Sequence, residues 1–257
     1  MNSGPACDSP LASAFVASPN FGERRGGSRP NALILHYTGM PTAEAALKLL
    51  VDPASEVSAH YFVFEDGRIV QLVPERGRAW HAGKAHWKGE SDLNSASIGI
   101  EIANPGHDGD APPFPDSQIA ATLALARDVL SRWKIPPERV LAHSDVAPDR
   151  KRDPGEGFPW ARLHKGGVGH WVEPAPVSGG PLFRHEEEGP PVRALQAMFA
   201  LYGYGLELSG VYDRRTRAVV AAFQRHFRPE RVDGEADAST VATLKALIER
   251  LGNSAPS

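Results

Sequence analysis

A stretch rich in proline and glycine, residues 173–191, divides this chain into two parts with different hydrophobic patterns. A run of both residue types between two patterned regions is typical of a linker between domains. Before it, short apolar runs alternate with amphipathic segments, and after it only segments of helical period occur. We therefore expect two domains, at residues 31–178 and 189–257, preceded by an N-terminal extended arm at residues 1–30.

The pattern of residues 31–178 predicts an α/β domain in which a mixed central β-sheet is flanked by helices. Short apolar runs bounded by turn residues indicate buried strands, and two such runs around Asp66-Gly67 indicate a hairpin. Apolar residues three and four positions apart indicate amphipathic helices. The expected strands lie within residues 31–38, 60–73, 97–103 and 140–143, and the expected helices span residues 42–51 and 116–134.

The second part predicts a small all-α domain of three helices, at residues 192–202, 213–227 and 237–251. A domain of roughly 65 residues is close to the lower limit for independent stability.

Charge and cysteine content exclude several classes of protein. The 257 residues carry 28 lysine and arginine against 31 aspartate and glutamate, a net charge of −3, which argues against a non-specific nucleic-acid binder. The single cysteine, Cys7, excludes an internal disulfide and a thiolate-rich zinc site. No protein partner is implied.

The sequence contains no apolar run near the ~20 residues that span a bilayer. Its first residues also lack the basic start and apolar stretch of a secretion signal. If Met1 is the native start, we expect a cytoplasmic protein; if a preceding segment has been removed, we expect the periplasm or cell envelope.

Candidate metal ligands follow two of the expected strands. His36 and His143 each end a strand, and Asp153 lies ten residues after His143. Two imidazoles and one carboxylate satisfy a hydrolytic zinc site, which keeps its fourth position open for water. A structural or solvated role for His36 is the alternative.

Two further charged residues are candidates for the chemistry. Glu101 interrupts an apolar strand, so it either faces solvent or is buried as a general base beside the metal. Lys151, two residues before Asp153, is either a surface lysine or the positive charge that stabilises an oxyanion.

Four motifs together resemble a known family. The strings Leu-His36-Tyr-Thr, Ala-Trp80-His81-Ala-Gly, Ser-Ile-Gly-Ile-Glu101 and the thirteen-residue run from His143 to Gly155 are similar, in this order, to those of the zinc-dependent N-acetylmuramoyl-L-alanine amidases of the AmpD/AmiD type. The resemblance covers roughly residues 25–172.

The resemblance implies a role for each matching residue. His36, His143 and Asp153 would bind one zinc ion per chain, Glu101 would be the catalytic carboxylate, and Lys151 would stabilise the oxyanion. Trp80 and His81 would line the substrate groove, and Asn104 could hydrogen-bond the substrate. Among the other histidines of this domain, His60 is expected to be packed, and four are expected at the surface: His86, His107, His164 and His170.

The second domain has a resemblance of its own. The run Gly210-Val-Tyr212-Asp213 and the later Phe223-Gln224 look like the three-helix peptidoglycan-binding domain often attached to cell-wall hydrolases. The third helix lacks the aromatic residue usual after Thr240, and most matching residues identify the fold rather than a binding surface.

We therefore expect a zinc amidase that cleaves the bond between N-acetylmuramic acid, or its 1,6-anhydro form, and L-alanine in peptidoglycan fragments. One alternative is a muropeptide-recognition module without activity, although such modules usually lack part of the zinc set. A second alternative is a zinc peptidase that acts within the stem peptide, but its usual later ligand motifs are absent from the sequence.

Overall fold

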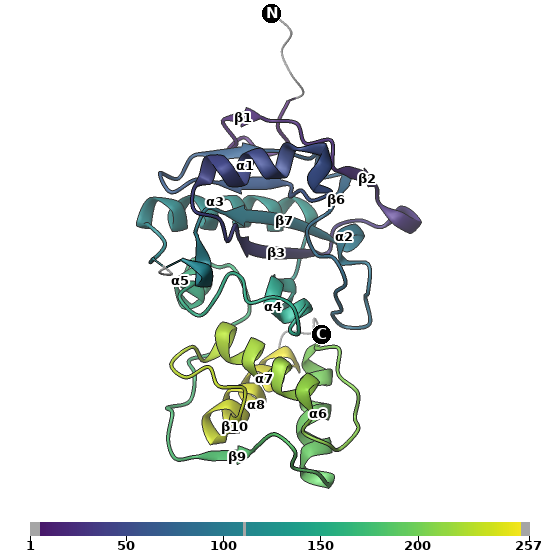
Figure 1. Ribbon diagram of the computed structural model, residues 1–257, viewed down its shortest axis with the longest axis vertical. Helices are drawn as coiled ribbons and strands as arrows, with labels where there is room; N and C mark the ends of the chain where they lie inside the picture. Colours follow the sequence, from purple (N-terminus) through teal and green to yellow (C-terminus); the bar gives the residue numbers. More distant parts are fainter. Residues whose placement is uncertain (1–5, 110–111, 253–257) are drawn as a thin grey trace, which may run out of the picture.

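The computed structural model describes residues 6–109 and 112–252. A sheet-containing domain packs against a smaller helical domain (Figure 1). The central sheet has six strands in the order β1-β5-β4-β7-β3-β8. All neighbouring pairs are parallel except β4 and β5, so the expected mixed sheet is confirmed. The strands are β1 (Ala14–Phe15), β3 (Ala32–Tyr37), β4 (Tyr61–Val63), β5 (Ile69–Gln71), β7 (Ser97–Ile102) and β8 (Val140–Ala142).

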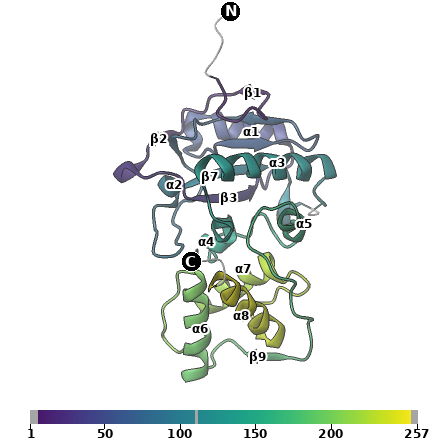
Figure 2. The ribbon, with the colours of Figure 1, turned by 180° about the vertical axis from the view of Figure 1, so that it is seen from behind.

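Helices cover both faces of this sheet. Helix α1 (Ala43–Val51) lies on one face and α3 (Asp116–Trp133) on the other, as the two opposite views show (Figures 1 and 2). The side-chain oxygen of Thr42 accepts a hydrogen bond from the Ala45 amide and so caps α1, where the sequence predicts the helix to begin. The shorter helices are α2 (Leu93–Ala96), α4 (His143–Val146) and α5 (Trp160–Lys165), with 3₁₀ turns at Arg25–Gly27, Pro53–Ser55, Gly106–Asp108 and Pro137–Arg139.

The N-terminal segment, expected as an extended arm, lies along the sheet domain. Its β1 extends the sheet beside β5, and β2 (Phe21–Glu23) pairs antiparallel with β6 (Gly77–Ala79). Arg24 donates hydrogen bonds to the carbonyls of Glu75 and Ser95, which ties the segment to two loops of the domain.

The second domain contains the three expected helices, α6 (Pro190–Tyr202), α7 (Arg214–Phe227) and α8 (Ala238–Gly252). The Asp213 carboxylate accepts from the Thr216 amide and caps α7. Part of the proline-rich linker is also regular, because β9 (Pro181–Phe183) pairs antiparallel with β10 (Ala236–Asp237).

The two domains share one hydrophobic core. Trp87 is fully buried, and its ring packs edge-on against Tyr202 and Tyr204, with centroids 5.9 and 4.9 Å away. His170, expected at the surface, is buried at this interface, where its Nδ1 lies 2.9 Å from the Tyr202 hydroxyl; that expectation was wrong because sequence periodicity does not show where domains meet.

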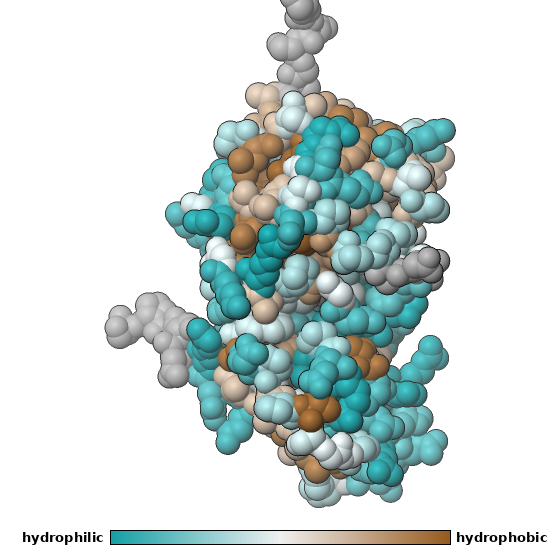
Figure 3. Space-filling model, turned by 90° about the vertical axis from the view of Figure 1, so that its left-hand side faces the viewer, coloured by the Kyte–Doolittle hydropathy of each residue, from teal (hydrophilic) through white to brown (hydrophobic). Residues whose placement is uncertain are grey.

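On the face shown in Figure 3, hydrophobic side chains form separate patches over both domains within a largely hydrophilic surface. Within the described residues, none of the helices combines the length and the apolar character needed to cross a bilayer.

Candidate metal centre and active site

The strand register brings the candidate residues to one edge of the sheet. β3 lies between β7 and β8 and is parallel to both, so the carboxyl ends of all three strands meet there. His36 pairs directly with Glu101 across β3 and β7. His143 is the first residue after β8, at the start of α4, and Asp153 lies on the loop that follows.

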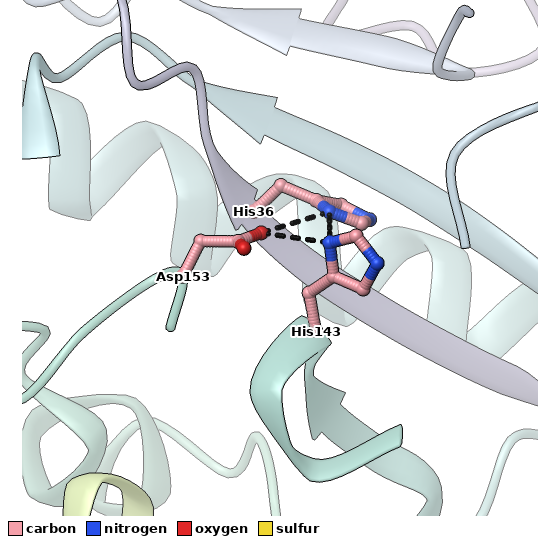
Figure 4. Close-up of side chains that lie close together, drawn as sticks. All are labelled: His36, His143 and Asp153. Atoms are coloured by element: carbon pink, nitrogen blue, oxygen red, sulfur yellow. Dashed lines mark hydrogen bonds and ion pairs between the residues drawn. The ribbon is translucent and has the colours of Figure 1, made fainter. Parts of the chain in front are cut away.

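Three buried side chains converge at this edge (Figure 4). His36 Nδ1 lies 2.9 Å from His143 Nδ1 and 3.1 Å from Asp153 Oδ2, and His143 Nδ1 lies 3.0 Å from the same oxygen. Within the described part of the chain, these three residues are the one group of histidine, cysteine and acidic side chains arranged closely enough to hold a metal ion.

The proton on His143 is placed by its other ring nitrogen. His143 Nε2 lies 3.2 Å from the carbonyl oxygen of Ala82, and a carbonyl only accepts hydrogen bonds. Nε2 therefore carries the proton in the neutral ring, which leaves a lone pair on Nδ1 directed at His36 and Asp153.

A chain of hydrogen bonds places the proton on His36 in the same way. The Ser97 hydroxyl donates to the Leu93 carbonyl, so its oxygen accepts from His81 Nε2, 3.3 Å away. His81 Nδ1 must then accept from His36 Nε2, at 3.0 Å. The lone pair of His36 Nδ1 therefore also faces the centre of the cluster. Hydrogen bonds from the outer ring nitrogen orient metal-ligating histidines in this manner.

The position of His81 in this series of hydrogen bonds also explains the glycine in the Ser-Ile-Gly-Ile-Glu101 motif. The ring of His81 packs on β7 at Gly99, where a Cβ atom would lie 2.6 Å from the ring. A side chain at residue 99 would displace His81 from His36.

Burial and neighbouring charges favour the ligand forms of these groups. Burial lowers the pKa of His36 to about 4, and repulsion from His143 acts in the same direction. Burial alone would raise the pKa of Asp153, but attraction and hydrogen bonds from His143 and His36 outweigh it and hold that pKa well below its usual range. At neutral pH His36 thus presents a neutral imidazole and Asp153 an ionised carboxylate.

The donor set fits a zinc ion. Two imidazole nitrogens and one carboxylate oxygen are common zinc ligands, and the ligand atoms of a tetrahedral site lie about 3.3 Å apart. The observed separations of 2.9–3.1 Å are close to this value. With both Nε2 atoms protonated, three lone pairs face one another, and a cation between them removes that repulsion.

Glu101 and Lys151 flank the cluster. Burial raises the pKa of Glu101 well above its usual value; the Asp153 carboxylate raises it further and Lys151 opposes the shift. Its Oε2 atom is buried and has no hydrogen-bond partner within the described residues. A basic carboxylate with a free oxygen, next to a metal site, is suited to accept a proton.

A cavity of about 480 Å³ opens onto these groups. Its lining includes the three clustered residues, Glu101 and Lys151, together with the half-buried Trp80 and the buried His81. Another part of the wall is mostly apolar and comes from α1 and the segments around it: Met40, Ala46, Leu49, Leu50 and Val57.

Asn104 does not line this cavity. Its Nδ2 donates to the Pro112 carbonyl, and its Oδ1 accepts from the Gly106 amide. The Asn104 amide group therefore holds its own loop.

Sequence reasoning missed a buried carboxylate behind the cluster. Asp145 is fully buried; its Oδ1 accepts from the Tyr204 hydroxyl at 2.8 Å, and its Oδ2 accepts from the Ala142 amide and from His226 Nδ1 at 2.8 and 2.7 Å. Tyr204 and His226 belong to the helical domain, so this domain contacts the turn that carries His143. The only sequence signal was the position of Asp145 inside the long His143 motif.

Comparison with protein families identifies both domains. Residues 26–156 match the family described as N-acetylmuramoyl-L-alanine amidase, and residues 188–244 match a putative peptidoglycan binding domain.

Characterised relatives align with one or both domains. The N-acetylmuramoyl-L-alanine amidase AmiD of Escherichia coli is 40% identical over 236 residues, which cover 87% of this chain and 84% of AmiD. The 1,6-anhydro-N-acetylmuramyl-L-alanine amidase AmpD of Enterobacter cloacae is 32% identical over 58% of this chain and 87% of AmpD.

Solved structures agree with this assignment. The complex of E. coli AmiD with anhydro-N-acetylmuramic acid-L-Ala-D-γ-Glu-L-Lys superposes with a TM-score of 0.74 at 37% identity and covers 91% of this chain and 98% of AmiD. AmpDh3 of Pseudomonas aeruginosa, in complex with anhydromuramic pentapeptide, gives a TM-score of 0.72 at 35% identity over 88% of this chain and 94% of its own. Sequence, fold and the residues at the sheet edge together place this chain in the N-acetylmuramoyl-L-alanine amidase family.

Proposed function

We propose that this chain hydrolyses the amide bond between the lactyl group of N-acetylmuramic acid and the L-alanine of the stem peptide. The observation that carries the proposal is the convergence of three metal-ligand lone pairs beside an unpartnered, basic carboxylate at the base of one cavity. Hydrolysis of an amide needs an electrophile, a base and an acid at one carbon atom, and this arrangement can supply all three.

His36, His143 and Asp153 hold the metal in this proposal, and zinc is the ion that suits them. When bound, zinc polarises the amide carbonyl and makes water more acidic. The hydrogen bonds from His36 to His81 and from His143 to the Ala82 carbonyl keep both imidazoles in the ligand tautomer.

Glu101 transfers a proton from the attacking water to the leaving nitrogen in this proposal. Its raised pKa makes it a stronger base than an exposed glutamate, so it can take a proton from the attacking water. It then delivers this proton to the alanine nitrogen as the carbon–nitrogen bond breaks. Water is consumed, and the products are a lactyl carboxylate and a free stem peptide.

Lys151 acts at the same carbon atom in this proposal. It is half-buried and lines the cavity together with Glu101 and Asp153. Its ammonium group stabilises the negative oxygen that forms when water adds to the carbonyl.

Anhydromuropeptides are the substrate form that we propose. The solved structures of AmiD and AmpDh3 named above each hold an anhydromuramic acid peptide. The apolar wall of the cavity and Trp80 offer contact area for the sugar and lactyl group.

Product analysis tests this function. Incubation with anhydro-N-acetylmuramic acid-L-Ala-D-γ-Glu-L-Lys, followed by mass spectrometry, should yield anhydro-N-acetylmuramic acid and the intact tripeptide. A chelator should abolish the reaction and zinc should restore it. Binding without cleavage would indicate a recognition module, and a shortened peptide that is still attached to the sugar would indicate a peptidase; either result would overturn the proposal.

A further inference from the structure

A second hollow lies directly beside the active-site cavity, between residues 148–152 and α7 of the helical domain. Its volume is about 440 Å³. Arg150, Lys151 and Arg152 line both hollows, so one short segment of the chain borders the active-site cavity and the second hollow.

One face of α7 forms the far wall. Arg214, Arg217, Ala221 and Arg225 are separated by three or four residues, which places them on the same side of the helix. The small Ala221 side chain leaves room between the longer arginines.

The charge in this hollow is unbalanced. Six cationic side chains line it against two carboxylates, those of Asp149 and Asp233. Asp149 pairs with Arg215, which lies outside the lining, and Asp233 lies 3.4 Å from Arg231, also outside.

The concentration of positive charge is local. The described residues provide no carboxylate within 4 Å of Lys151, Arg152 or Arg214, although the whole chain has a net charge of −3. Like charges held together raise the energy of the folded protein, and a cleft lined by one sign of charge attracts a ligand of the other.

The two hollows therefore differ in chemistry, and so do the two ends of the substrate. The apolar wall suits the uncharged sugar, and the cationic hollow suits an anion. In the ligand bound by AmiD, the γ-linked glutamate leaves its α-carboxylate free, and the peptide ends in a second carboxylate. The first of these lies about 7 Å, two residues, beyond the scissile amide.

We propose that the hollow between residues 148–152 and α7 binds the free carboxylates of the stem peptide. Arg214 and Arg217, from the helical domain, then contact the substrate of the catalytic domain. Arginine suits this role because its planar guanidinium group forms paired hydrogen bonds with carboxylates. The inference rests on the proposed amidase function and adds a determinant of substrate choice.

The test uses a pair of substrates and two double variants of the full chain. One substrate is the anhydromuramoyl tripeptide named above, and the other has the free glutamate α-carboxylate converted to a carboxamide. The test variant is Arg214→Gln with Arg217→Gln. The control is Arg184→Gln with Arg193→Gln, which removes two exposed arginines, one from the linker and one from the helical domain, that do not line the hollow.

The native protein and the control should prefer the carboxylate substrate, mainly through KM, by about tenfold at low salt. The test variant should lose most of this preference. Rising ionic strength should reduce the preference of the native protein. A test variant that keeps the full preference would overturn the proposal, as would a native protein that shows none.

Calorimetry separates a failure of this inference from a failure of the proposed function. The free tripeptide L-Ala-D-γ-Glu-L-Lys should bind the native protein more tightly than the test variant even if neither substrate is cleaved. Equal binding would refute the carboxylate site, whereas tighter native binding without any cleavage would refute only the amidase function.

Discussion

Two buried polar clusters lie on either side of the α4 turn, and they differ in how their atoms are satisfied. In one, the Asp145 carboxylate accepts three hydrogen bonds, one from its own turn and two from the helical domain. In the other, the lone pairs of His36, His143 and Asp153 face one another without protons between them. His143 and Asp145 are two residues apart, so one short turn carries both.

The difference shows how this fold separates stability from chemistry. A fully paired buried carboxylate fixes the position of the turn. Without it, the three buried groups that donate to Asp145 would have no acceptor, which would lower the stability of the folded protein. In the proposed function the open cluster binds a cation, which would complete it. The predictions below test this contrast, beginning with the largest expected effect.

Glu101→Gln should lower turnover by about 10²–10⁴-fold, because a carboxamide cannot accept the proton of the attacking water. Zinc content should stay near one per chain, since Glu101 is not among the converging ligands. Steady-state kinetics and metal analysis on the same sample measure both. Glu44→Gln, on the outer surface of α1, is the matched control and should leave turnover unchanged. Native turnover in the Glu101 variant would exclude its role as base.

Asp145→Ala should destabilise the protein by about 3–5 kcal/mol, because it leaves the Ala142 amide, Tyr204 and His226 without their acceptor. Urea unfolding measures this loss. Asp149→Ala removes the exposed pair with Arg215 at the same domain interface and should cost less than about 1 kcal/mol. Equal losses in the two variants would contradict the difference between a buried network and a surface pair.

Tyr204→Phe and Tyr212→Phe compare one hydrogen bond in two settings. Both tyrosines are buried; Tyr204 donates to the Asp145 carboxylate and Tyr212 to the Gly234 carbonyl. Loss of the bond to a charged acceptor should cost about 2 kcal/mol and loss of the neutral one about 1 kcal/mol. A larger loss of stability in Tyr212→Phe than in Tyr204→Phe would contradict the stronger hydrogen bond that we assign to Tyr204 and Asp145.

The smallest effect concerns the stability of the metal-free protein. The pKa of Glu101 is raised in the folded state, so the folded protein keeps a proton that the unfolded chain releases above its pKa of about 4.5. Stability should therefore fall as pH rises through that value. Metal-free Glu101→Gln lacks this loss and should be more stable than the native metal-free protein by about 1 kcal/mol at pH 7, and equal to it near pH 4. Thermal unfolding at both pH values measures the difference, and parallel pH profiles would contradict it.

The sequence predicted much of the fold because its hydrophobic periods are clear. The hairpin around Asp66-Gly67, the strand that contains Glu101 and the three C-terminal helices lie where periodicity placed them. Periodicity did not predict β1, whose two residues are too few to show a pattern, nor the pairing of β9 with β10 within the linker region.

The site was harder to predict beyond the motif residues. The motifs brought together His36, His143, Asp153, Glu101 and Lys151, and the structure gathers these residues around one cavity. The hydrogen bond from His36 to His81, the pairing of Asp145 with His226 and the arginines of α7 join positions from 45 to 81 residues apart in the chain. Such contacts depend on how distant segments pack within the first domain and between the two domains, and a single sequence contains no pattern for them.

The most direct measurement determines zinc content and turnover together in the native protein and in Asp153→Asn. We expect one zinc per native chain and release of intact stem peptide from the anhydromuramoyl tripeptide. Asp153→Asn should lose both zinc and turnover, because a neutral amide replaces the ionised ligand. Native turnover in zinc-free protein, or in Asp153→Asn, would contradict the account.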